Sequence, residues 1–227
     1  MNTAIIVAAG SGSRFNSDIP KQFLEISGRP VIDYALECFE RCVAVDEIVL
    51  VLAAEYVLKF EQRKIRSGYS KLKQIVGGGR TRAESVNRGL SVVNISTEVV
   101  AVHDGARPLV SQEEIRRAIE RAGEVGAACL VAPVVDTIKH VEGGFISGTV
   151  DRGRLRRALT PQAFRYEILI QAFRDADLSE SVTDECFLVE KLGVPIAVVE
   201  GSPRNIKITH PQDLALAEFY LRQEQPN

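Results

Sequence analysis

Short apolar runs alternate along the chain with longer segments in which apolar residues recur at helical spacing. The continuous runs, which predict buried strands, are residues 3–8, 47–52, 72–76, 99–102, 127–135 and 196–199. The segments with helical spacing are residues 31–42, 55–67, 81–92, 111–122, 166–176, 183–192 and 211–222. Ser111 and Glu114 have the spacing of a capping box, with Ser111 as the N-cap. Strands that alternate with helices predict an α/β protein with a mainly parallel sheet.

One segment departs from this alternation. Residues 137–150 contain two strand-like stretches around Gly143 and Gly144, which predicts an antiparallel hairpin. Such a hairpin is an excursion from a parallel domain, so we expect an arm over about residues 136–158 that covers the site or grips a partner subunit. The chain has no internal repeats and no low-complexity linker, and we expect a single domain over residues 1–227.

The composition narrows the class of protein. Of the 227 residues, 45% are hydrophobic and 26% are charged, as in a soluble globular domain, and the net charge of −2 gives no basic field for nucleic acid or a membrane surface. No apolar run approaches the roughly 20 residues of a membrane span. The start has no features of a secretory signal, so we expect the mature start of a cytoplasmic protein. The four cysteines form no metal-binding pair, which favours free thiols in a reducing compartment.

The first strand runs into a series of small residues that favours a phosphate site. These residues are Ala8, Ala9, Gly10, Ser11 and Gly12. A backbone of this kind approaches a ligand closely, and its N–H groups cradle phosphates. Arg14 and Lys21 flank the loop as cationic clamps. Phe15 stands where the dinucleotide fingerprint needs its third glycine, which argues against that motif, and no Walker motif is present. An ordinary turn after a buried strand would show the same small residues.

Two further clusters follow predicted strands, where ligands bind in open α/β sheets. Gly78 and Gly79 lead into Arg80, Arg82 and Ser85, and this loop allows the backbone to reach a flat ligand edge. A flexible turn is the alternative, although a basic first helical turn opposes the helix dipole.

The second cluster is the segment 103–108, which contains Asp104, Gly105, Ala106 and Arg107. Asp104 is a candidate ligand for Mg²⁺ or for ribose, the alternative being a turn or cap aspartate. We expect His103 to be structural.

The arm and the region before the last helix complete the candidate chemistry. Thr137 and Arg152 lie near the two roots of the arm, with Thr160 at its return, and these groups suit recognition of a second phosphate. A solvated charged hairpin is the alternative. Lys207 lies in a predicted strand between Ile206 and Ile208, and alternation puts it on the opposite face from both. We expect Lys207 to bind ligand, with protection of an edge strand as the alternative.

Together these segments resemble the 2-C-methyl-D-erythritol 4-phosphate cytidylyltransferase family, over nearly the whole chain. The matching motifs are Ala8-Ala9-Gly10-Ser11-Gly12-Ser13-Arg14, Pro20-Lys21-Gln22-Phe23, Ser85-Val86, Val102-His103-Asp104-Gly105-Ala106-Arg107-Pro108, Thr160-Pro161-Gln162, Thr183-Asp184-Glu185 and Asn205-Ile206-Lys207-Ile208-Thr209. One departure is Phe15-Asn16, where many members have Met-Gly. The length leaves no room for the cyclodiphosphate synthase domain that is fused in some relatives, so we expect none.

The resemblance implies a fold, an assembly and residue roles. The fold is a three-layer, Rossmann-like nucleotide-diphospho-sugar-transferase fold, with a twisted, mainly parallel sheet and a protruding β-hairpin arm. The assembly is a homodimer whose arms complete each other's sites. Arg14 and Lys21 would be the catalytic, transition-state stabilising pair. The implied CTP-binding residues are Ala8, Ala9, Gly10, Ser11, Gly12, Gly78, Gly79, Arg80, Ser85, Asp104, Gly105, Ala106 and Lys207. The implied methylerythritol phosphate-binding residues are Asp104, Arg107, Thr137, Arg152, Thr160 and Lys207, and Asp104 is also the metal candidate.

These roles predict transfer of CMP from CTP to 2-C-methyl-D-erythritol 4-phosphate, in the non-mevalonate isoprenoid pathway, with Mg²⁺ or another divalent cation. The substrate phosphate is already an anion, so placed cations are needed rather than a general base. The alternatives are a ribitol-5-phosphate cytidylyltransferase and a non-catalytic nucleotide-binding module. Gly105-Ala106-Arg107 favours methylerythritol over ribitol, and the full set of cations argues against a mere sensor.

Overall fold

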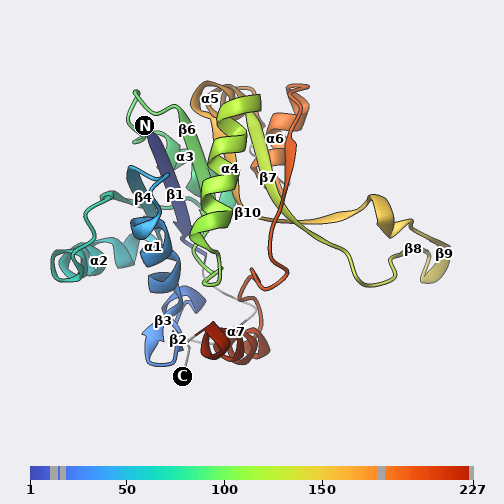
Figure 1. The fold of residues 1–227 in the computed structure, drawn as a ribbon, viewed down its shortest axis with the longest axis horizontal. Coiled ribbons are helices and arrows are strands. Elements are labelled where there is room, and N and C mark those ends of the chain that lie inside the picture. Colours follow the sequence, from blue (N-terminus) through green and yellow to red (C-terminus); the bar gives the residue numbers. More distant parts are fainter. Residues whose placement is uncertain (11–14, 16–18, 178–181, 225–227) are drawn as a thin grey trace.

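The computed structural model describes residues 1–10, 15, 19–177 and 182–224. Its centre is a seven-stranded sheet in the order β11-β7-β10-β6-β1-β4-β5 (Figure 1). The strands are β1 (Asn2–Ala8), β4 (Glu47–Leu52), β5 (Leu72–Gly77), β6 (Val99–Asp104), β7 (Ala127–Pro133), β10 (Arg156–Arg165) and β11 (Ala197–Glu200). All neighbours are parallel except those of β10, which is antiparallel to both β6 and β7. The prediction of a mainly parallel sheet is confirmed.

Helices cover both faces of this sheet. They are α1 (Val31–Arg41), α2 (Ala54–Ser67), α3 (Arg82–Leu90), α4 (Gln112–Val125), α5 (Tyr166–Arg174), α6 (Glu185–Lys191) and α7 (Pro211–Glu224). Helices α1, α2 and α4 pack on one face, and α3, α5 and α6 on the other, because each buries an apolar stripe against strands that are apolar on both sides. Ser111 caps α4 in the predicted capping box with Glu114.

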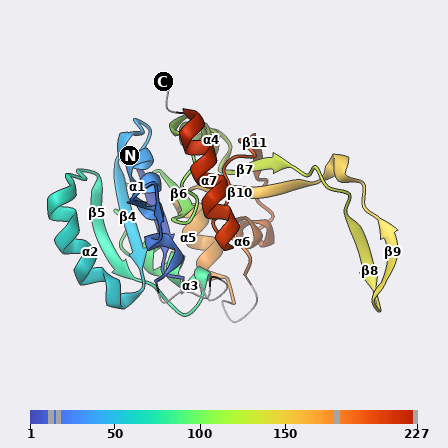
Figure 2. The same ribbon diagram turned by 90° about the horizontal axis from the view of Figure 1, so that it is seen from below.

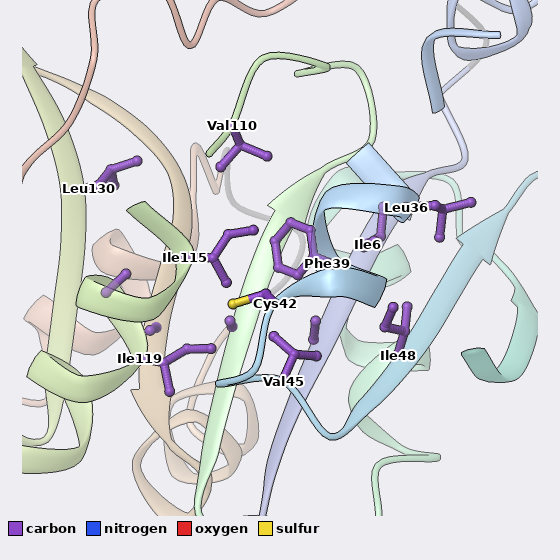
Figure 3. Packing of buried hydrophobic residues seen from close by; sticks show 14 of the residues in the cluster. Ile6, Leu36, Phe39, Cys42, Val45, Ile48, Val110, Ile115, Ile119 and Leu130 are labelled. Carbon is purple, nitrogen blue, oxygen red and sulfur yellow. The ribbon is translucent and has the colours of Figure 1, made fainter. Parts of the chain in front are cut away.

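The larger core lies between α1, α4 and the sheet. Phe39 of α1 and Ile115 of α4 point toward each other above β1 and β6 in Figure 3, and both side chains are fully buried. Burial of apolar side chains at this density is the main stabilising term of the fold. It holds the strands in register, so that Ile5 of β1 lies between Val49 of β4 and Val102 of β6.

The predicted arm is present. Strands β8 (Lys139–Glu142) and β9 (Phe145–Thr149) form a separate two-stranded hairpin, followed by the short helix η3 (Arg152–Arg154). The hairpin projects away from the rest of the molecule in both views (Figures 1 and 2). Two small elements near the start of the chain are the helix η2 (Lys21–Phe23) and the strand pair β2 (Glu25–Ile26) and β3 (Arg29–Pro30).

Two features differ from the sequence-based expectations. Strand β10 was not predicted, because Pro161 and several charged residues interrupt its apolar pattern; a register shift between Ala158 and Gln162 accommodates the proline. The strand predicted around Lys207 is absent, because residues 205–209 have no regular secondary structure and join no sheet. The alternation is nevertheless correct, since Ile206 and Ile208 pack into a third apolar cluster while Lys207 faces a pocket.

Candidate active site

A pocket of about 470 Å³ opens at the carboxyl ends of β1 and β6. It is lined by Val7, Ala8, Ala9, Gly10, Lys21, Gln22, Gly79, Arg80, Thr81, Arg82, Ser85, Asp104, Ala106, Lys207 and Thr209. Open α/β sheets bind ligands at this edge. Four of the lining side chains are cationic and one, Asp104, is a carboxylate, so the pocket suits a polyanion. Predicted residues that are far apart in the chain therefore meet here.

The turn that carries Lys21 is tied to the end of β1. Gln22 is buried, and its Nε2 donates hydrogen bonds to the carbonyl oxygens of Ala8 at 2.7 Å and Gly10 at 3.3 Å. These bonds fix the position of Lys21 relative to the backbone that forms the floor of the pocket. Gln22 is a positioning residue, and in the sequence it stands out only as part of the motif Pro20-Lys21-Gln22-Phe23. The predicted residues Ser11, Gly12 and Arg14 lie outside the described residues.

The glycine loop after β5 packs directly against β1. A Cβ on Gly78 would overlap the Cβ of Ala9 and would come within 2.9 Å of the Ser85 Oγ, so only glycine fits there. A Cβ on Gly105 would likewise come within 2.9 Å of the Cβ of Ala8. Neither Gly78 nor Gly105 lines the pocket; both lie behind its wall and allow the close approach that forms it.

Ser85 is held by the turn that begins α3. Its hydroxyl accepts a hydrogen bond from the Gly79 N–H at 3.1 Å and donates one to the Thr81 carbonyl at 2.8 Å. Thr81 is the N-cap of α3, accepting from Glu84 N–H. The Arg80 side chain is 92% exposed at the rim, where it pairs with Glu84.

Asp104 is the centre of a buried ion cluster. Its Oδ1 lies 2.9 Å from Arg82 Nε, and its Oδ2 lies 2.8 Å from Lys207 Nζ and 3.6 Å from Arg107 Nε. Burial alone would raise the pKa of Asp104, but the three cations outweigh it and hold that pKa well below its usual range. Asp104 is therefore ionised at neutral pH. Lys207 lines the pocket, whereas its neighbours Ile206 and Ile208 pack in an apolar cluster, as the predicted alternation requires.

Arg82 has a second carboxylate partner, Glu185 of α6. Arg82 Nη1 and Nη2 donate to the two oxygens of Glu185 at 2.6 and 3.0 Å, and the Glu185 side chain is fully buried. The sequence predicts no role for Arg82, although a cation at the start of a helix is unfavourable for helix stability, and Glu185 is only part of a motif there. A basic residue in a first helical turn was the signal available for Arg82.

Thr160 and Arg107 lie behind the pocket rather than along its wall. The Thr160 hydroxyl accepts from the Asp104 N–H at 3.1 Å and lies 3.0 Å from His103 Nδ1. Arg107 donates to the Asn205 carbonyl at 2.7 Å, and the Asn205 side chain donates to the Thr160 carbonyl at 2.9 Å. This network fixes the loop that follows β6.

His103 is structural, as the sequence predicted. Its ring is fully buried, and burial lowers the pKa of His103 to about 4, so the imidazole is neutral. Nε2 lies 3.1 Å from the Arg107 carbonyl. A carbonyl only accepts, so Nε2 carries the hydrogen and Nδ1 accepts from Thr160.

Thr137 and Arg152 are exposed at the base of the arm, and neither lines this pocket. Arg152 Nη1 donates to the Val135 carbonyl, which braces the two roots of the arm against each other. Both residues are thus available to another molecule.

A metal ion would find few protein ligands in the described part of the chain. No group of three or more His, Cys, Asp or Glu side chains there could hold one. Asp104 is the only carboxylate that lines the pocket among the described residues. That donor set fits an ion such as Mg²⁺, which binds through one or two carboxylates and the phosphates of a substrate.

Comparisons with known proteins identify the family of the chain. A family model described as IspD, 2-C-methyl-D-erythritol 4-phosphate cytidylyltransferase, matches residues 2–223. A protein of that name from Syntrophus aciditrophicus is 42% identical over 226 residues, which cover 98% of this chain and 96% of the relative. A bifunctional IspD/IspF enzyme from Desulfotalea psychrophila is also 42% identical, but the chain spans only 58% of its length.

Solved structures show the same fold. The 2-C-methyl-D-erythritol 4-phosphate cytidylyltransferase of Thermus thermophilus superposes with a TM-score of 0.78 at 34% identity, covering 96% of this chain and 98% of that one. The 4-diphosphocytidyl-2C-methyl-D-erythritol synthase of Anaerococcus prevotii superposes with a TM-score of 0.85 at 29% identity, covering 97% and 96%.

Proposed function

Because the chain belongs to the 2-C-methyl-D-erythritol 4-phosphate cytidylyltransferase family, we propose that its pocket transfers CMP from CTP to 2-C-methyl-D-erythritol 4-phosphate. The products are 4-diphosphocytidyl-2-C-methyl-D-erythritol and pyrophosphate, in non-mevalonate isoprenoid biosynthesis. The protein is a nucleotidyltransferase. The observation that carries the proposal is the meeting of Lys21, Asp104 and Lys207 in one pocket with the backbone of residues 8–10, at the carboxyl end of β1.

The chemistry needs charge placement more than proton transfer. An oxygen of the substrate phosphate attacks the α-phosphorus of CTP in line, a P–O bond forms, and the bond to the pyrophosphate leaving group breaks. Both reactants are anions, and negative charge builds on the α-phosphoryl oxygens. Lys21, with Arg14, would stabilise that charge, and the backbone of residues 8–10 and Ser85 would hold the nucleotide.

Asp104 and Lys207 would orient the sugar groups beside the reacting phosphates. Their 2.8 Å ion pair fixes both side chains before ligand arrives, so little reorganisation is needed on binding. A divalent cation such as magnesium would supply further neutralisation of the phosphates, with Asp104 as its protein ligand.

The test of the site is the turnover of Lys21→Ala. Loss of one transition-state charge partner costs on the order of 3 kcal/mol, so we expect kcat to fall by roughly 100-fold or more in a folded protein. The assay is pyrophosphate release with CTP and methylerythritol phosphate. Lys73→Ala is the matched control, because Lys73 is exposed on β5 and does not line the pocket. Wild-type turnover by Lys21→Ala would refute the assignment.

We further propose that the enzyme works as a homodimer in the cytoplasm. The arm projects from the body (Figure 2), Thr137 and Arg152 do not line the pocket of their own subunit, and Val141, Phe145 and Ile146 are exposed on the arm, which supports contact with a second copy. The four cysteines are free thiols, which supports a reducing compartment. No helix in the described residues has the length and apolar character to cross a membrane.

Mixing two inactive variants tests the shared site. A heterodimer of Lys21→Ala and Arg152→Ala subunits would hold one site with both defects and one intact site, if each arm serves the partner. Random mixing should then restore about a quarter of wild-type activity. A mixture as inactive as its components would contradict the proposal.

A further inference from the structure

Glu185 is a buried carboxylate with no role in the chemistry described above. It is the first residue of α6, and Asp184 before it serves as the N-cap by accepting from the Phe187 N–H. The side chain of Glu185 is fully buried and does not line the pocket. Burying a carboxylate costs free energy unless an opposite charge pairs with it. The residue that pairs with Glu185 therefore indicates what the buried charge does.

That partner is Arg82, which Glu185 grips through both oxygens. Bonds of 2.6 and 3.0 Å from Nη1 and Nη2 hold the planar guanidinium in one orientation. The third bond of Arg82, from Nε, goes to Asp104 Oδ1 at 2.9 Å. Arg82 thus links a carboxylate outside the pocket to one inside it.

The bidentate ion pair between Glu185 and Arg82 determines which cation binds each oxygen of Asp104. With Nη1 and Nη2 held by Glu185, Arg82 reaches only Oδ1, and Oδ2 remains with Lys207 at 2.8 Å. Without the charge of Glu185, the fork of Arg82 would be free to take both oxygens of Asp104 or to turn into the pocket that it already lines. In either case Asp104 and Lys207 would lose their mutual orientation.

We propose that Glu185 is a positioning residue of the transferase, which acts through Arg82 to orient Asp104 and Lys207 for the nucleotide. This inference rests on the proposed function. The pyrophosphate-release assay on the wild-type protein tests the proposed function by itself. An inactive wild type would contradict that function, whereas the variants of Glu185 test only its positioning role.

The experiment is a double-mutant cycle in kcat/KM for CTP. Partners that orient the ligands of a site are typically worth 10- to 100-fold in activity, so Glu185→Gln should lower kcat/KM by about that factor. In an Arg82→Gln background the same substitution should change it by less than about twofold, because the link is already cut. A residue that only stabilised the fold would give no such coupling at a temperature where every variant is folded.

A buried carboxylate of similar type serves as the control. Glu114 of α4 is also buried, but it accepts hydrogen bonds from the Ser111 and Ser202 backbone, away from the pocket. Glu114→Gln should therefore lower stability and leave kcat/KM unchanged. If Glu185→Gln does not fold, Glu185→Asp keeps the charge but withdraws it by one methylene, and the same cycle applies. Equal losses in both backgrounds, or activity within about twofold of wild type, would overturn the proposal.

Discussion

At the scale of single residues, the pocket depends on buried polar side chains that bond to the backbone around it. Gln22 holds the Lys21 turn, His103 and Thr160 hold the Asp104 loop, and each does so through hydrogen bonds to backbone atoms. Buried polar groups of this kind are costly to leave unpaired, and they therefore define one geometry.

The neutral His103 predicts a pH dependence of stability. Its native pKa of about 4 lies below the value of 6.5 in an unfolded chain, so the unfolded chain takes up a proton first as pH falls. The free energy of unfolding should fall by about 2 kcal/mol between pH 7 and pH 5 from this group alone. Urea unfolding at both pH values measures it.

The controls for this prediction are two histidine variants. His103→Gln should lose that part of the pH dependence, although it lowers stability at both pH values. His140→Gln, on the exposed arm, should keep the wild-type dependence. Equal pH dependence in wild type and His103→Gln would show that the imidazole is not buried neutral.

Gly78 predicts a steric limit on the pocket wall. In Gly78→Ala the added methyl would overlap Ala9, which should cost about 1–3 kcal/mol of stability and reduce kcat/KM for CTP by about tenfold or more. Gly123→Ala in α4 is the control, since its Cβ would meet only Val99 Cγ2 at an ordinary 3.8 Å. That variant should gain up to about 1 kcal/mol with normal activity. An active, stable Gly78→Ala protein would contradict the packing.

At the scale of elements, α4 and β10 show how differently local and distant interactions specify structure. Four consecutive residues specify the start of α4, because the side chains of Ser111 and Glu114 each accept a hydrogen bond from the other's backbone N–H. Strand β10 has no such local signal. It forms because β6 and β7 each have an edge that pairs with it. The hydrogen bonds and packing on its two sides outweigh the ladder hydrogen bond that Pro161 cannot donate.

The cap of α4 gives a stability prediction. Ser111→Ala removes the acceptor for the Glu114 N–H and should lower the free energy of unfolding by about 1 kcal/mol, with no change in activity. Ser91→Ala, at the exposed C-terminal end of α3, should change it by less than about 0.5 kcal/mol. Thermal or urea unfolding compares the two, and equal effects would argue against the capping box.

At the scale of the whole molecule, the apolar side chains of the arm do not pack against the body of their own subunit. Phe145 is 80% and Ile146 is 68% exposed, on a hairpin that touches little of its own body (Figure 2). Apolar side chains gathered on a projecting segment mark an interaction surface.

Substitutions on the arm test its part in assembly. If Phe145 and Ile146 pack on a second copy, Phe145→Asp with Ile146→Asp removes about 2 kcal/mol or more of apolar burial per residue. The molecular mass from light scattering should then fall to that of a monomer, with loss of activity. Ile95→Asp, equally exposed but on the body, should leave the mass unchanged. A dimer that survives both arm substitutions would contradict the proposal.

The residue pattern alone was enough for the α/β class, nearly every helix and strand, the hairpin arm and the motifs around the pocket. These features depend on contacts within one element or one turn, such as the spacing of apolar residues or the pairing of Ser111 with Glu114. The role assigned to each motif stays a prediction, as does the position of Arg14.

Features that join distant segments emerged only in three dimensions. Glu185 and Arg82 are separated by 103 positions, and Thr160 and Asp104 by 56, so no local spacing relates them. Strand β10 runs antiparallel among parallel neighbours, and Lys207 faces the pocket from a segment that is not a strand. In each case the interaction partner depends on how the elements pack around the sheet. The free energy of burying a charge or of pairing a sheet edge is set by residues that only folding brings together.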